Sequence, residues 1–443
     1  MFATIKSLGL FGLNAFPVDV EVDIQKGLPH FDIVGLPDAA VKESRERIRA
    51  ALYSISVTLP PKHIVVNLAP ADVKKSGTMH DLAILVGVLK SMGQLSCSMQ
   101  GKFFIGEVSL SGEVRSVNGV LPMTILARSL GVEELYVPAD NAAEAATIQD
   151  VRVFGVHNIG ELIDHLEGDA PLSPAQPADF TEPDAPENLL DFSDVKGQQT
   201  VKRALEIVAA GGHNVLLVGA PGSGKSMLAK RMPYILPEMT MEESIETTNI
   251  YSISGLLDPK HPLITKRPFR APHHTISGVG LVGGGTVPHP GEISLAHNGL
   301  LFLDELAEFD RHTLDILRQP LEDHIVTITR AAGTISYPCR FMLVGAMNPC
   351  PCGYYGHPKR RCSCSPQAIQ RYRSRISGPL LERFDLQVEV DPVSYEDLTT
   401  TEPIETSADI RKRVQAAREI QEKRFSGTSI FCNAQIPAGK LQQ

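Results

Sequence analysis

The chain has 443 residues, of which 43% are hydrophobic, and this indicates two or three globular domains at about 150 residues per domain. Its formal net charge of −9 excludes a protein coated in basic surface, so any nucleic-acid contact is expected in a groove, a loop or an assembled pore. The sequence has neither a run of about eighteen apolar residues nor a basic leader with a cleavage site, which favours a soluble cytoplasmic protein.

Residues 1–165 are predicted to form an α+β domain, because short strand-like runs alternate with amphipathic helices. The predicted strands are Ile64–Leu68, Lys102–Ile105 and Leu135–Val137, and the predicted helices are Ala39–Tyr53, His80–Met92 and Asn141–Ile148. Residues 166–191 are rich in Pro, Ala, Asp and Glu without a periodic apolar face, and they are predicted to be a linker.

A second domain, of α/β type, is predicted over residues 192–392, where apolar strands alternate with helices or long insertions. The predicted strands are Val215–Val218, Leu300–Leu303, Phe341–Gly345 and Leu386–Val390. Continuous apolar runs of this kind are typical of a parallel sheet covered by helices on both faces. A charged helix over Ser407–Lys423 is expected within the last segment, residues 393–443, which is too short to close a core of its own.

A glycine-rich turn with the sequence GAPGSGKS follows the first strand of this domain and leads into a helix that is expected to begin near Gly224. Such a turn directs unpaired backbone N–H groups toward one point, where phosphate oxygens bind. Lys225 is expected to neutralise the β and γ phosphates of ATP, and the Ser226 hydroxyl is expected to bind the Mg²⁺ that accompanies them. The residues expected to surround the nucleotide are Gly219, Ala220, Pro221, Gly222, Ser223, Gly224, Lys225, Ser226 and Met227.

An acidic pair, Asp304 and Glu305, ends the apolar strand Leu300–Leu303. Asp304 is expected to bind the metal ion and Glu305 to orient the attacking water. On its own, such a pair would be interpreted as a solvated strand end. Together with the glycine-rich turn, it favours hydrolysis of a nucleoside triphosphate over binding alone.

Four of the seven cysteines fall within fifteen residues, at Cys350, Cys352, Cys362 and Cys364. Four thiolates at this spacing can surround one tetrahedral ion, and Zn²⁺ is the favoured ion, with Fe–S ligation or free thiols as alternatives. A structural role is expected, because four protein thiolates leave no open position for water. The odd number of cysteines fits a reducing compartment better than a disulfide framework.

Five further stretches complete a collinear series with these motifs. They are DVKGQ at Asp194–Gln198, RPFRAPHHTIS at Arg267–Ser277, GGGTVPHPGEISLAHNG at Gly283–Gly299, GAMNPCPCG at Gly345–Gly353 and LLERFDL at Leu380–Leu386. The series resembles the magnesium-chelatase-like AAA+ ATPases, and most closely the bacterial ComM/YifB competence-protein family, over essentially the whole chain. The resemblance implies an AAA+ P-loop ATPase domain that assembles into a homo-oligomeric ring, expected to be hexameric, with each nucleotide between two subunits.

The same resemblance implies roles for two further residues. Asn348 matches the sensor asparagine that helps to place the lytic water. Arg383 matches the arginine finger that reaches into the neighbouring subunit's site and stabilises charge on the transferring phosphoryl group. The family's helical lid, with its second sensor arginine, would lie beyond Gln443, so the lid is expected to be incomplete in this sequence.

The N-terminal domain, from Val20 to Val137, resembles the domain shared by chelatase-related proteins and the Lon protease. In Lon a serine nucleophile and a lysine base follow each other in two glycine-containing stretches. Here Lys75–Asp81 places Met79 at the position of the serine, and Val117–Met123 has no lysine. A thioether cannot attack a peptide bond. An alignment shifted by one residue would place Thr78 at that position, but the missing lysine base still argues against proteolysis, and we expect this domain to bind a protein partner or DNA, or to shape the ring.

Family membership further implies a DNA motor, a helicase or translocase that drives branch migration of recombination intermediates during transformation. The alternatives are a chelatase-type motor that acts on a protein partner to insert a metal, and a nucleotide-switched scaffold with little turnover. Sequence support for DNA contact is limited to basic stretches at Lys359–Arg361, Arg371–Arg375 and Arg411–Arg413, and charge runs of this kind are more often solvated surface. The adjacent His273 and His274 are interpreted as loop residues without a catalytic role.

Overall fold

The computed structural model describes residues 2–177, 190–285, 288–330, 333–393, 399, 404–428, 430–437 and 439. The chain divides into two compact units, one formed by Met1–Phe180 and Thr248–Ile264, the other by Thr181–Thr247 and Thr265–Gln443. Positions 178–189 of the predicted linker, and parts of residues 393–443, lie outside the described ranges. Within those ranges, no helix combines the length and the apolar composition that crossing a bilayer requires.

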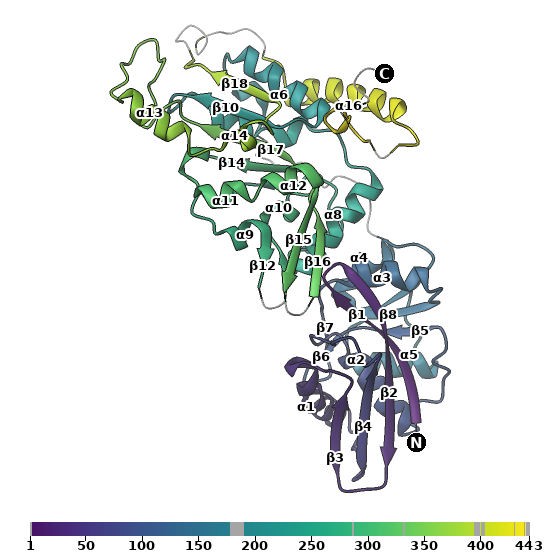
Figure 1. Ribbon diagram of the computed structural model, residues 1–443. Helices are drawn as coiled ribbons and strands as arrows, with labels where there is room; N and C mark the ends of the chain where they lie inside the picture. Colours follow the sequence, from purple (N-terminus) through teal and green to yellow (C-terminus); the bar gives the residue numbers. More distant parts are fainter. Residues whose placement is uncertain are drawn as a thin grey trace. The chain divides into compact units, whose positions relative to one another are not determined.

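The first unit is a mixed seven-stranded sheet with helices packed on it, and its strands follow the order β3-β4-β2-β1-β5-β8-β9 (Figure 1). The strands are β1 Phe2–Phe11, β2 Asn14–Gln25, β3 His30–Val34, β4 His63–Ala69, β5 Lys102–Phe104, β8 Glu134–Pro138 and β9 Arg152–Val156, and a small ribbon joins β6 Glu107–Val108 to β7 Val114–Arg115. The helices are α1 Ala39–Ser54, α2 Asp81–Ser91, α3 Val120–Ser129, α4 Ala142–Ala146 and α5 Ile159–Glu167. The predicted strands and helices of residues 1–165 are confirmed, although α4 is shorter than expected.

The long hairpin of β1 and β2 is the main element of this unit that the sequence analysis did not predict. In β2 the side chains of Val18, Val20, Val22 and Ile24 are buried in alternation with more exposed neighbours, as in a strand with one face on the core. Because buried and more exposed side chains alternate along β2, this strand could have been predicted from the sequence.

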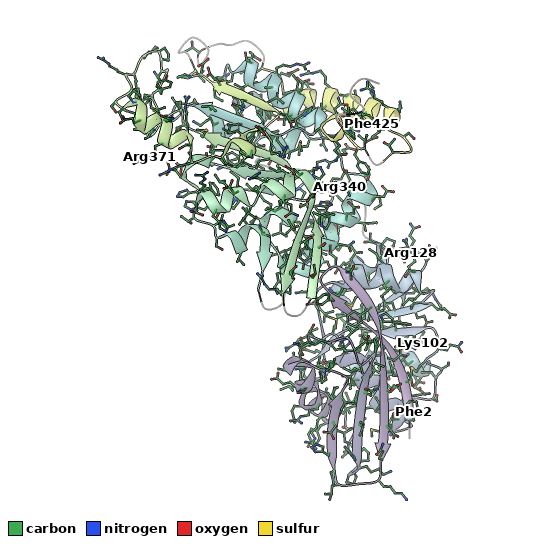
Figure 2. The ribbon with its side chains drawn as sticks, viewed as in Figure 1. Phe2, Lys102, Arg128, Arg340, Arg371 and Phe425 are labelled. Atoms are coloured by element: carbon green, nitrogen blue, oxygen red, sulfur yellow. The ribbon has the colours of Figure 1, made fainter. Side chains whose placement is uncertain are left out.

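Lys102 of β5, labelled in Figure 2, forms an ion pair with Glu134 of the adjacent strand β8.

One buried ion pair connects two helices of the first unit. Asp81, the first residue of α2, is fully buried, and its Oδ2 accepts a hydrogen bond from Arg47 Nε of α1 at 2.6 Å. Burial raises the pKa of the Asp81 carboxyl, while Arg47 and Ser44 oppose that shift by hydrogen bonding to the charged form. Met79, at the position that a Lon nucleophile would occupy, packs against the hydrophobic core.

The second unit contains a five-stranded parallel sheet in the order β11-β14-β17-β10-β18 (Figure 1). The strands are β10 Val215–Gly219, β11 Phe269–Arg270, β14 Leu300–Leu303, β17 Met342–Met347 and β18 Leu386–Val390. The helices are α6 Gln199–Gly211, α7 Lys225–Ala229, α9 Gly278–Val282, α10 Glu292–Leu295, α11 Arg311–Asp315, α12 Arg318–Asp323, α13 Pro366–Arg373, α14 Gly378–Leu381 and α16 Ser407–Arg424, and α8 Met241–Ser254 begins in this unit and belongs to the first unit from Thr248 onward. The predicted parallel α/β fold and all four predicted strands are confirmed.

Two additions surround this sheet. The helix α16, predicted as Ser407–Lys423, packs beside α6 and contributes Ile410 and Val414 to the same hydrophobic core as β10 and β17. Two antiparallel ribbons, β12 Gly283–Gly284 with β13 His289–Pro290 and β15 Ile325–Arg330 with β16 Gly333–Pro338, are joined by a hydrogen bond from Tyr337 Oη to the Pro288 carbonyl at 2.9 Å. The ribbons extend from the sheet, whereas α16 covers it.

Candidate nucleotide-binding site

The glycine-rich turn follows an inner strand of the parallel sheet, β10, which pairs with β17 on one side and β18 on the other. The helix α7 begins at Lys225, as the sequence predicts. In parallel strands the carboxyl ends meet at one edge, and ligands of open α/β sheets bind at that edge where the strand order reverses. The turn, the acidic pair after β14 and Asn348 after β17 therefore share one edge.

The turn requires glycine at two kinds of position. Gly224 has a φ of 95°, in the left-handed region that other residues rarely adopt, and a Cβ placed there would have no heavy atom within 4 Å. A Cβ on Gly219 would instead lie 2.4 Å from the Val390 carbonyl oxygen. Gly224 therefore leaves open space beside the turn, and Gly219 allows β10 and β18 to approach each other.

Lys225 is held inside the turn. Its side chain is 8% exposed, and Nζ donates hydrogen bonds to the carbonyl oxygens of Gly219 at 2.7 Å and Ala220 at 2.9 Å, and to Asn348 Oδ1 at 3.3 Å. Burial lowers the pKa of the ammonium group, and the nearby Asp304 carboxylate opposes that shift. The lysine is thus a desolvated, positioned charge, and the predicted sensor residue Asn348 is in direct contact with it.

The predicted metal ligands also meet. Ser226 Oγ donates a hydrogen bond to Asp304 Oδ2 at 2.6 Å, and Asp304 Oδ1 accepts one from the Glu305 backbone N–H at 2.9 Å. Glu305 has a φ of 51°, a left-handed conformation that is uncommon for a residue with a side chain and that concentrates at functional sites. A hydroxyl beside a carboxylate supplies the oxygen ligands that Mg²⁺ prefers.

The donor set fits a magnesium nucleotide. An ammonium group, a hydroxyl and a carboxylate converge beside a turn whose amides begin a helix, and this combination binds phosphate together with a hard cation. The Ser223 hydroxyl of the turn is 1% exposed and has no hydrogen-bond partner among the described residues, so it is a further polar atom that a ligand could satisfy.

His274 contacts the acidic pair, which the sequence analysis did not anticipate. Its Nδ1 lies 3.4 Å from Glu305 Oε2, and its ring is half-buried against Phe309. The histidine follows β11, which pairs with β14, so it reaches the same edge of the sheet as Glu305. Because β11 has only two residues, no strand signal in the sequence placed His274 there.

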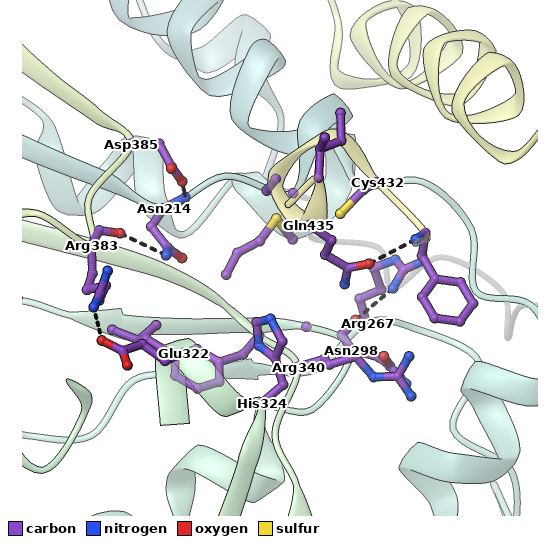
Figure 3. Close-up of a pocket in the computed structure, with 18 of the residues that line it drawn as sticks. Asn214, Arg267, Asn298, Glu322, His324, Arg340, Arg383, Asp385, Cys432 and Gln435 are labelled. Atoms are coloured by element: carbon purple, nitrogen blue, oxygen red, sulfur yellow. Dashed lines mark hydrogen bonds and ion pairs between the residues drawn. The ribbon is translucent and has the colours of Figure 1, made fainter. Parts of the chain in front are cut away.

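Arg383 lies apart from this cluster. It precedes β18, its carbonyl accepts a hydrogen bond from Asn214 Nδ2 at 2.9 Å, and its guanidinium pairs with Glu322 of α12 (Figure 3). It lines a cavity of about 370 Å³ together with Asn214, Met342 and Asp385, residues at the amino ends of β10, β17 and β18. Arg383 therefore lies at the edge of the sheet opposite to Lys225.

The four clustered cysteines converge as the sequence predicts, and their Sγ atoms all lie within 4.8 Å of one another. Cys350 Sγ is 3.4 Å from Cys352 Sγ and 3.7 Å from Cys362 Sγ, too long for disulfides. Four sulfurs at about 2.3 Å from one tetrahedral zinc ion would be separated by about 3.8 Å, close to these values. Backbone N–H groups of Tyr354 and Ser363 lower the pKa of the Cys352 thiol, whereas the pKa values of Cys362 and Cys364 are raised, because burial and the neighbouring Cys352 and Cys350 outweigh the backbone N–H groups that these two thiols accept from.

Comparison with known proteins identifies relatives over both units. A family model described as "Magnesium chelatase, subunit ChlI" matches residues 191–398, and one described as "Subunit ChlI of Mg-chelatase" matches residues 20–141. The competence protein ComM of Haemophilus influenzae is 44% identical over 436 residues, which cover 98% of this chain and 85% of that protein. YifB of Escherichia coli is 43% identical over 415 residues, 93% of this chain and 81% of the relative. The magnesium-chelatase 38 kDa subunit of Rhodobacter capsulatus is 25% identical over 251 residues, 52% of this chain and 68% of that protein.

Substitution of one clustered cysteine tests the metal site. We expect Cys362→Ser to release bound zinc, because three thiolates and a hydroxyl bind zinc more weakly than four thiolates, and to leave nucleotide affinity largely intact. Metal content measured by mass spectrometry on the purified protein checks this. The control is Cys97→Ser, a half-buried cysteine of the first unit. Equal zinc content in the wild type and Cys362→Ser would contradict the site.

Proposed function

The chain belongs to the magnesium-chelatase-like ComM/YifB family, and on this basis we propose that it is an AAA+ ATPase that couples hydrolysis of Mg·ATP to the remodelling of DNA. The observation that carries the proposal is the contact network of Lys225, Ser226, Asp304 and Asn348 at one edge of a parallel sheet. These side chains come from three separate strand ends, and their charges suit a triphosphate with its metal ion.

In this proposal the turn after β10 holds the phosphates through its backbone amides, and Lys225 neutralises the β and γ phosphates. Ser226 and Asp304 bind Mg²⁺, which supplies charge neutralisation for the transferring phosphoryl group when it is bound. The hydrogen bond between Ser226 and Asp304 supports a shared role, since it already holds both oxygens at one point.

Glu305 accepts the proton of the attacking water, and Asn348 orients that water. Glu305 suits this role because its carboxylate is exposed, follows the metal ligand Asp304 directly and lies 3.4 Å from His274 Nδ1. His274 holds one carboxylate oxygen and leaves the other available, so we assign it a positioning role. The acidic pair also favours an enzyme over a nucleotide-switched scaffold.

Arg383 completes the site in trans, as an arginine finger for the next subunit of a homo-oligomeric ring, which we take to be a hexamer. Its place at the opposite edge of the sheet from Lys225 supports this role, because a finger of the same subunit would have to cross the sheet. Glu322 pairs with the guanidinium and sets its direction within the subunit.

DNA is the proposed substrate, and branch migration of recombination intermediates during transformation the proposed task. The support is the identity of 44% to a protein named for competence, which extends over 98% of this chain, against 25% over 52% for the chelatase subunit. The first unit would bind DNA or a protein partner, or shape the ring. The cysteine cluster would hold a structural Zn²⁺.

The ATPase rate as a function of protein concentration, with and without four-way junction DNA, tests the proposal. We expect the rate per subunit to rise steeply with concentration, since each site needs a neighbour's Arg383, and to increase further with branched DNA. Double-stranded DNA without a branch serves as the control. A rate that depends on neither concentration nor DNA would contradict the ring and the substrate together.

Substitution of His274 tests its assigned role. His274→Ala should lower kcat for ATP hydrolysis with little change in KM, because the ring contacts Glu305 but none of the described residues of the phosphate-binding turn. His274→Gln should recover part of the rate, since an amide can still donate to the carboxylate. His261, which pairs with Asp258, provides the control His261→Ala. A raised KM at constant kcat would refute the positioning role.

A further inference from the structure

The stretch from Pro349 to Leu381, here called the basic segment, has a composition unlike the rest of the chain. It contains six Lys and Arg residues and no Asp or Glu, within a protein of net charge −9. It comprises the cysteine loop and the helices α13 and α14. Figure 1 shows the cysteine loop and α13 extending beyond the end of the parallel sheet of the second unit. An acidic protein has thus gathered positive charge on one projecting element.

Most of these cations are exposed and have no acidic partner among the described residues. Lys359, Arg360, Arg361 and Arg371 are all exposed, and within the described ranges no carboxylate lies in ion-pair distance of them. Figure 2 shows Arg371 at the outer side of α13. Arg375, by contrast, pairs with Glu308 at 2.8 Å. Four positive charges are therefore available to an external anion.

The third basic stretch of the sequence behaves differently. Arg413 of α16 forms ion pairs with Glu206 and Glu405, and Lys412 lies 3.8 Å from Asp409. These charges are balanced by carboxylates of the same unit, and the pair of Arg413 with Glu206 joins α16 to α6. The stretches Lys359–Arg361 and Arg371–Arg375 thus present unpaired cations to solvent within the described residues, whereas cations of Arg411–Arg413 form ion pairs within the fold.

Tyrosine rings lie between the cations. The guanidinium of Arg360 lies 5.1 Å from the centre of the Tyr354 ring, and Nη1 donates a hydrogen bond to Tyr354 Oη at 2.6 Å. Arg373 lies 5.2 Å from the centre of the Tyr355 ring, which is 49% exposed. Aromatic rings beside guanidinium groups form a surface on which unpaired bases can stack.

An open groove runs along α13. It has a volume of about 870 Å³ and is lined by Gln367, Gln370, Arg371, Ser374 and Arg375. Its lining includes amide and hydroxyl groups and the Arg371 guanidinium, which can bind phosphate and sugar oxygens, together with the Glu308 carboxylate that pairs with Arg375. Phosphate contacts of this type fix a strand in place without selecting its sequence.

The basic segment also touches the phosphate-binding turn. A Cβ at Gly353, next to Cys352, would lie 2.5 Å from Pro221 Cδ, so the cysteine loop rests directly on the turn. A cavity of about 160 Å³ beside this contact is lined by Gly219 and Ala220 on one side and by Tyr355, His357 and Arg373 on the other. A ligand that contacts Tyr355 or Arg373 would therefore lie close to the phosphate-binding turn.

We propose that the basic segment is a binding surface for single-stranded DNA, in which Lys359, Arg360, Arg361 and Arg371 contact phosphates and Tyr355 stacks on a base. The proposal rests on the proposed function in that it takes DNA as the substrate and names where a strand is held. The cysteine cluster gives this surface a rigid base, and the contact of Gly353 with Pro221 links strand binding to the nucleotide site.

Fluorescence anisotropy with a labelled oligothymidylate, over a series of salt concentrations, tests this surface. The variant Arg360→Ala/Arg371→Ala should bind more weakly, and its slope of log affinity against log salt should be less steep by about 0.7 for each phosphate that the variant no longer neutralises. Tyr355→Ala should weaken binding without changing that slope, because it removes stacking and not charge. Lys412→Ala removes an exposed charge from α16 and should bind like the wild type.

The outcomes separate the surface from the proposed function. A wild type that binds no DNA overturns both. A wild type whose ATPase is stimulated by DNA, with an unchanged salt slope in the double-arginine variant, overturns the surface alone. Equal affinity for polyglutamate and oligothymidylate contradicts the nucleic-acid assignment. For the double-arginine variant, unstimulated ATPase activity equal to that of the wild type verifies folding, because neither Arg360 nor Arg371 belongs to the nucleotide site. For Tyr355→Ala, whose ring lines the cavity beside the phosphate-binding turn, an unchanged far-UV circular dichroism spectrum verifies folding.

Discussion

The parallel alignment of β10, β14 and β17 is the constraint on which the rest of the second unit depends. It brings Lys225, Asp304 and Asn348, which are far apart in the sequence, to one edge of the sheet, where Lys225 contacts Asn348 and Asp304 binds the neighbouring Ser226. Both β14 and β17 are buried on both faces, and their parallel register, with Leu303 opposite Gly345, brings the acidic pair to the same edge as the turn.

The two edges of the same sheet divide the proposed chemistry between subunits. The carboxyl edge carries the phosphate-binding turn, and the amino edge carries Arg383 and its partner Glu322. A ring that places one subunit's amino edge against the next subunit's carboxyl edge would complete each site. The basic segment extends this arrangement, because it follows Asn348 directly and rests on Pro221 of the turn. A change at the nucleotide site could then reach the bound DNA strand through the contact of Gly353 with Pro221.

The sequence predicted those parts of the site whose signals are local. The strand β14 with its acidic pair, and the turn before Lys225, each carry their pattern within a few residues. The contact of His274 with Glu305 depends on β11, which has two residues and becomes a strand only by pairing with β14. The sequence also could not show which basic stretches have acidic partners. Arg413 pairs with Glu206, which is more than 200 positions away, and with Glu405, which is close by but not part of a recognisable pattern. Tertiary pairing of this kind leaves no periodic trace in one chain.

Binding of a non-hydrolysable ATP analogue with Mg²⁺, measured by isothermal titration calorimetry, tests whether this edge of the sheet is a nucleotide site. The wild type and Glu305→Gln should bind the analogue with similar affinity, because Glu305 contacts water and not phosphate. Lys225→Ala should lose most of that affinity, whereas Lys230→Ala, an exposed lysine at the end of the same helix, should retain it. Unchanged affinity in Lys225→Ala would contradict the account.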